Sequence, residues 1–179
     1  MNERMKTTLR AWPVITAATI GLCFATQTVA KLFGIDLPDQ DQVEFVRRYA
    51  GWNLTFAFIV MQVAVLVPVI EELLFRCALW KAPLMAFGHW DKGGQAPRAA
   101  LAVAVSALFS FAHYVDYPML AASPSKFALT GWNCAFIALF FFGLAQCWLY
   151  RRGGALWCAM LNHMLFNLTN LVLLLALPR

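Results

Sequence analysis

The chain has 179 residues, of which 61% are hydrophobic and only 13% are charged, and its mean hydropathy is +0.65. A soluble domain carries about 45–50% apolar and about 25% charged residues, so this composition excludes an ordinary soluble protein and indicates a single-domain integral membrane protein. The net charge of +5 comes from basic residues scattered along the chain. This scatter argues against a nucleic-acid partner and favours loops beside an anionic lipid surface.

The N-terminal part of the chain, residues 1–52, predicts one helix and one loop. An apolar stretch over residues 11–34 follows three basic residues and is long enough to cross a membrane, whereas a signal peptide would be shorter. The acidic segment 35–52 contains a proline and predicts a loop, with a short interfacial helix over residues 43–49.

The remainder, residues 53–177, predicts the core of the protein. Its apolar runs are separated by polar, glycine- and proline-containing segments, and they cover residues 53–80, 98–114, 127–150 and 155–177. We therefore predict an all-α, polytopic membrane protein with about five transmembrane helices and one domain over residues 1–179. With five spans, the N-terminal segment and every second loop lie on one side of the membrane, and these segments are more basic than those on the other side. The positive-inside rule therefore predicts a cytoplasmic N terminus and an external C terminus.

Ionisable side chains, one of them with an amide on the next helical turn, interrupt three of these apolar runs. A charge inside hydrocarbon costs at least a few kcal/mol, so such residues predict a functional site. They are Glu71, Glu72, Arg76, His113, His163 and Asn167. Glu72 and Arg76 are four residues apart on a predicted helix and can pair, whereas Glu71 is about 100° further round the axis and stays free.

The helical rise of 1.5 Å per residue places Glu71, His113 and His163 at comparable depths below the cytoplasmic ends of their helices. We therefore expect the three side chains to meet around an intramembrane polar cavity. The third helix then ends inside the bilayer, just after His113. Irregular backbone at that depth must line a cavity or be covered by protein, so residues 114–126 are a candidate gate or water path.

These residue types fit two kinds of hydrolysis. In the first, Glu71 and His113 activate a water molecule for attack on a carbonyl, and His163 and Asn167 donate hydrogen bonds to the oxyanion. In the second, Glu71, His113 and His163 bind zinc and leave its fourth position open. The chain has no HExxH motif. The spacing therefore does not favour zinc, and we prefer the metal-free reaction.

Functions other than hydrolysis also use such residues. Buried Glu–Arg pairs and intramembrane histidines stabilise many helix bundles. A non-catalytic immunity or peptide-binding membrane protein could hold a peptide in the same cavity. A proton or ion carrier would place ionisable groups along a pathway through the membrane.

Three motifs in this chain resemble those of one family of membrane proteins. They are EELLFR (71–76), FSFAH (109–113) and HMLFN (163–167), in this order. The family is the CPBP family of intramembrane proteases, which contains CAAX prenyl proteases and bacteriocin-processing proteins and is also called Abi. The segment 141–167 also resembles the last two core helices of the family, and the likeness covers about residues 53–177.

The resemblance implies that Glu71 is the catalytic glutamate and that His113 helps it to activate water. It implies an oxyanion site of His163 and Asn167, and a glutamate-type mechanism without a metal cofactor. The residues expected to support the site are Glu72, Arg76 and Phe109.

The expected partners are the lipid bilayer and a substrate that is a peptide or a membrane-anchored protein, with no nucleic acid. With a single helix before the motifs, the chain looks like a minimal, bacterial-type member, which implies a bacterial inner membrane. It departs from the family at one point. Members often have Gly-x-x-x-Gly in the fourth helix, where this chain has Gly143 and Cys147.

Overall fold

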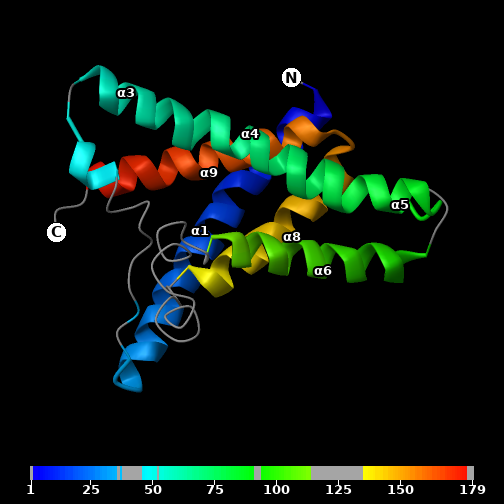
Figure 1. Ribbon diagram of the computed structural model, residues 1–179, viewed down its shortest axis with the longest axis horizontal. Helices are drawn as coiled ribbons and strands as arrows, with labels where there is room; N and C mark the ends of the chain where they lie inside the picture. Colours follow the sequence, from blue (N-terminus) through cyan, green and yellow to red (C-terminus); the bar gives the residue numbers. More distant parts are fainter. Residues whose placement is uncertain are drawn as a thin grey trace, which may run out of the picture.

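The predicted all-α fold is confirmed by a computed structural model of the chain (Figure 1). The model describes residues 2–35, 37, 46–51, 53–90, 94–113 and 135–176, and these contain no strand. The long helices are α1 (Glu3–Leu32), a continuous rod (Leu54–Ala86), α6 (Gln95–Ala112), α8 (Phe136–Gly153) and α9 (Leu156–Ala176). The predicted gate at residues 114–126 lies outside the described residues.

The rod over Leu54–Ala86 contains two π-helical segments. The side chain of Asn53 caps its start by accepting a hydrogen bond from the backbone N–H of Phe56 at 2.8 Å. Pro68 and Pro83 lie inside the rod and lack the N–H of a normal helical hydrogen bond. A wider, π-helical segment lies just before each proline, and the rod continues past both. The segments are α3 (Leu54–Met61), η1 (Gln62–Leu66), α4 (Val67–Glu72), η2 (Leu73–Lys81) and α5 (Ala82–Ala86).

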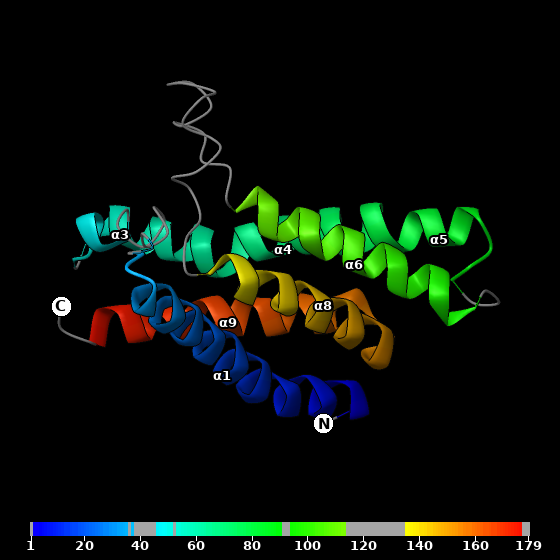
Figure 2. The same cartoon turned by 90° about the horizontal axis from the view of Figure 1, so that it is seen from below.

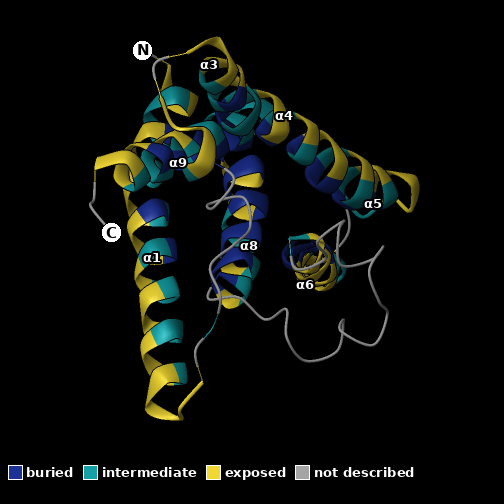
Figure 3. Ribbon diagram, turned by 60° about the vertical axis from the view of Figure 1, so that its left-hand side comes forward, coloured by how far each residue is buried: buried dark blue, intermediate teal, exposed yellow. Residues whose placement is uncertain are grey.

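Helix α8 lies at the centre of the bundle. It packs against α1, α6 and α9, and Figure 3 shows it buried along most of its length, whereas the outer face of α1 is exposed. The middle of the rod packs on α6 and α9. This arrangement brings the motif-bearing parts of the rod, α6 and α9 around one interior region.

Four of the described helices are long and apolar enough to cross a membrane, namely α1, the rod, α6 and α9. The remaining predicted span, the fourth in chain order over residues 127–150, corresponds to α8, which is described from Phe136 and carries Arg151 and Arg152 in its last turn. The predicted runs end at residue 150 and resume at residue 155, but the helix continues through Gly153. Basic side chains stabilise the C-terminal end of a helix, and Gly154 ends it in the left-handed conformation at φ = 68°.

Helices α6 and α8 approach closely at Gly143. A Cβ atom at this position would lie 2.9 Å from the Cβ of Ser106. Close packing on α8 is therefore present although Cys147 occupies the second position of the glycine pattern. The thiol of Cys147 is itself buried.

We expect Gly143→Ala to destabilise the protein by about 1–3 kcal/mol, because the added methyl group must push α6 away from α8. Gly21→Ala is the matched control, since its Cβ would meet no atom within 4 Å. Thermal unfolding of both variants in detergent measures the difference. Equal unfolding midpoints for the two variants would show that this helix contact contributes nothing.

Candidate active site

The carboxylate of Glu71 lies between two histidines that come from different helices. Its Oε1 is 3.5 Å from Nε2 of His113, the residue at the end of α6. Its Oε2 is 3.6 Å from Nε2 of His163, in the middle of α9. The structure thus brings together the three ionisable groups that the depth argument placed side by side.

The other nitrogen of each imidazole is held by a hydrogen-bond acceptor. Nδ1 of His113 lies 2.8 Å from the backbone carbonyl oxygen of Phe109, and Nδ1 of His163 lies 2.9 Å from Oε1 of Glu72. A carbonyl oxygen or an ionised carboxylate only accepts hydrogen bonds, so both Nδ1 atoms carry a proton. Each Nε2 facing Glu71 therefore accepts a hydrogen bond when its ring is neutral, and donates one only when the ring is protonated.

Glu72 joins the histidine to an arginine in the buried interior. Its Oε2 lies 3.3 Å from Nε of Arg76, which is the predicted pair four residues apart, and both side chains are fully buried. Its Oε1 binds His163 instead of remaining with the arginine. We expected Glu71 and Glu72 to have different partners, because they point about 100° apart on the helix. The imidazole of His163 nevertheless contacts both carboxylates, because its two nitrogens lie on different edges of the ring.

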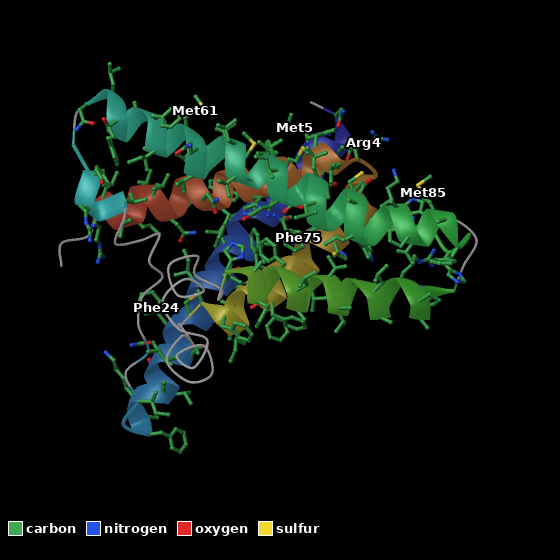
Figure 4. All side chains as sticks on the ribbon, in the orientation of Figure 1. Arg4, Met5, Phe24, Met61, Phe75 and Met85 are labelled. Carbon is green, nitrogen blue, oxygen red and sulfur yellow. The ribbon has the colours of Figure 1, made fainter. Side chains whose placement is uncertain are left out.

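Phe109 supports this group from one side. Its fully buried ring has its centroid 4.5 Å from that of His113 and 6.0 Å from that of His163. The guanidinium carbon of Arg76 lies 4.6 Å from the same ring centroid. Phe75, labelled in Figure 4, packs against Phe109 from the rod at 5.2 Å. One aromatic ring therefore fixes both histidines and the arginine.

Asn167 lies one helical turn beyond His163 on α9, and its amide has a backbone partner. Nδ2 donates a hydrogen bond of 2.8 Å to the carbonyl oxygen of Val63, in the π-helical segment η1. Such segments leave carbonyl groups outside the regular ladder, and a side-chain amide can satisfy one of them. The amide nitrogen has two hydrogens, so one N–H of Asn167 remains for another acceptor.

The side chains of the site differ in how far they are exposed to solvent. The side chains of Glu72 and Arg76 are 0% exposed, whereas those of Glu71 and His113 retain 19% and 14% exposure. Arg76 balances the charge of Glu72, which leaves the charge of Glu71.

Sequence reasoning missed the contact between Glu72 and His163, whose positions are 91 residues apart. It also missed two neighbours on α8. The backbone carbonyl of Gly143 accepts a hydrogen bond from Nη2 of Arg76, and the ring of Phe142 lies 5.0 Å from that of His163. A glycine and a phenylalanine in an apolar helix carry no signal of this kind, so only the packing reveals them.

The residues that the structure describes contain no group of three or more His, Cys, Asp or Glu side chains placed to hold a metal ion. The zinc alternative named Glu71, His113 and His163. In the structure the two Nε2 atoms approach different oxygens of Glu71. The zinc site stays a prediction, and metal removal tests it.

The fold and the site together define a polytopic helical membrane protein with a buried carboxylate–imidazole group. Residues 51–169, more than half of the chain, match the family model described as type II CAAX prenyl endopeptidase Rce1-like. The chain therefore belongs to this family and is, in general class, a CAAX-type intramembrane protease. The matched stretch contains every residue of the group described above. No curated protein and no solved structure matches the chain significantly.

Proposed function

We propose that this protein hydrolyses a peptide bond in a peptide or a membrane-anchored protein, using a water molecule activated by Glu71 and His113. The observation that supports the proposal most is the position of the Glu71 carboxylate, whose two oxygens face Nε2 atoms from two different helices. The remaining exposure of Glu71 and His113 gives this side of the group access to water and substrate.

The first chemical step requires two acceptors for the protons of one water. An ionised Glu71 and the neutral Nε2 of His113 are 3.5 Å apart, which is long for a direct hydrogen bond and leaves both atoms able to accept from a bridging water. The water oxygen attacks the carbonyl carbon as one of its protons passes to Glu71. Glu71 then delivers this proton to the leaving amine, so that water is added across the cleaved C–N bond.

The second requirement is donors for the oxyanion of the tetrahedral intermediate. Nε2 of His163 becomes a donor when the ring is protonated, and the carboxylate of Glu72 at Nδ1 stabilises that imidazolium. The free N–H of Asn167 is the second donor. One such donor contributes a few kcal/mol to transition-state stabilisation. No covalent intermediate is needed.

Because these residues carry the chemistry without a metal, we expect chelation to leave cleavage unchanged. Purified protein is treated with a strong chelator, its metal content is measured, and its cleavage rate is compared with that of untreated protein. Loss of activity that added zinc restores would assign Glu71, His113 and His163 to a metal site instead.

The proposal is tested by comparing fragments of membrane proteins from cells that carry wild-type protein or Glu71→Gln. We expect fragments that occur only with wild-type protein, and their new termini identify the cleavage site. A non-catalytic immunity or peptide-binding protein predicts identical fragments and protection that survives the substitution. Ion flux through the purified protein in liposomes, without fragments, would indicate a carrier.

A further inference from the structure

Two cations are held at one indole ring at the end of the bundle that contains the N terminus. Figure 2 shows the N terminus, the end of α8 and the turn after α5 on this side, opposite the C terminus. Nζ of Lys81 lies 5.6 Å from the ring centroid of Trp90 and 5.7 Å from that of Tyr150. The guanidinium carbon of Arg151 lies 4.8 Å from the Trp90 centroid. We call these four residues the aromatic–basic cluster.

The rings of this cluster are fixed by their neighbours. Trp90 packs edge-on against Trp80, with centroids 5.3 Å apart, and lies 5.6 Å from the ring of Tyr150. Nη1 of Arg98 donates to the backbone carbonyl of Trp90 at 3.0 Å, and Nε1 of Trp80 donates to the carbonyl of Arg98 at 3.1 Å. Segments from the rod, α6 and α8 thus hold the two cations in one place.

The positive charge of the cluster has no acidic partner within the described part of the chain. The ion pairs there involve Glu3 on α1 and the two glutamates of the buried site. Asp91 and Asp116, the acids between residues 81 and 152, lie outside the described residues. Another cation lies on this side, because the guanidinium of Arg4 lies beside Gly154 at the end of α8 (Figure 4).

We propose that the aromatic–basic cluster binds the phosphate headgroup of an anionic phospholipid at the membrane surface on the N-terminal side. Trp side chains such as the half-buried Trp90 occupy the lipid–water interface, and Lys and Arg side chains there attract anionic headgroups. Phe87, in the turn after α5, and Trp148, on α8, are exposed apolar residues. The acyl chains of a bound lipid would cover these two side chains, whereas a free phosphate ion would leave them exposed. The proposed occupant is therefore a lipid.

The test is a titration of the purified protein in detergent with phosphatidylglycerol or phosphatidylcholine, with bound lipid counted by native mass spectrometry. We expect wild-type protein to bind phosphatidylglycerol several-fold more tightly. Lys81→Gln combined with Arg151→Gln should lower this affinity by about tenfold or more, because each cation near an anionic headgroup contributes severalfold. The single variant Arg151→Gln, whose side chain is exposed, keeps the test decisive if the double variant does not fold.

The control removes two exposed cations of α1 that are not part of the cluster, by Arg10→Gln combined with Lys31→Gln. It should keep the wild-type lipid preference. Equal binding of the two lipids by wild-type protein, or an equal loss in the control, would overturn the proposal. Displacement of the lipid by inorganic phosphate at equal concentration would also overturn the proposal, because the cluster would then recognise phosphate alone and the acyl chains would contribute nothing.

Discussion

Replacing Glu71 by Gln is expected to lower the rate of peptide-bond cleavage by about a thousandfold, because a glutamine of similar shape cannot accept a proton from water. General-base catalysis contributes about 10²- to 10⁴-fold, and here the same group also returns the proton to the leaving amine. The fold should persist, since Glu71 makes no contact shorter than 3.5 Å with its two histidines. The measurement is the cleavage rate of purified protein, with the unfolding midpoint recorded alongside.

The matched control for this prediction is Glu3→Gln. Glu3 is an exposed carboxylate on α1 that pairs with Lys6 at the surface, so its replacement should leave the cleavage rate unchanged. Wild-type activity in Glu71→Gln would contradict the assigned role. An equal loss in Glu3→Gln would show that the effect follows from net charge and not from the site.

Replacing Arg76 by Met is expected to lower the free energy of unfolding by about 3–5 kcal/mol. Glu72 is fully buried, and among the described residues the substitution leaves the imidazole of His163 as its one remaining ion-pair partner. It also removes the hydrogen bond to the carbonyl of Gly143 and the contact with the ring of Phe109. Chemical or thermal denaturation in detergent measures the loss.

The double variant Glu72→Gln/Arg76→Met is the control that separates charge from packing. Removing both charges avoids a buried unpaired ion, so the double variant should be more stable than Arg76→Met alone. Its cleavage rate should still be low, because Nδ1 of His163 loses the carboxylate that orients it. A double variant that is less stable than Arg76→Met would mean that packing and not charge dominates at this position.

The helices and the convergence of Glu71, His113 and His163 could be predicted, because both follow from local features of the sequence. The apolar run over residues 98–114 corresponds to α6 at Gln95–Ala112, which differs by only a few residues at each end. The spacing of Glu72 and Arg76 determined that they share a helix face. The approach of His113 to Glu71 could be predicted for two reasons. Placing an ionisable group in hydrocarbon costs free energy, which marks both residues as parts of a site, and the helical rise gives them comparable positions along their helices.

The partners of the site residues could not be predicted, because they depend on how the helices pack. The contact of His163 with Glu72 requires a particular rotation of α9 against the rod. The bond from Asn167 to the carbonyl of Val63 depends on a π-helical segment. Its nearest signal in the sequence is Pro68, and a proline inside an apolar run predicts a kink as readily as a wider turn.

The most direct test of the central claim is a comparison of cleavage rates for Glu71→Gln, His113→Asn and the double variant on one substrate. Two residues that act on the same water form one catalytic unit, and losses within such a unit do not multiply. We predict that the double variant cleaves about as slowly as Glu71→Gln alone. Losses that multiply, or a single variant that cleaves at the wild-type rate, would contradict the shared role of Glu71 and His113.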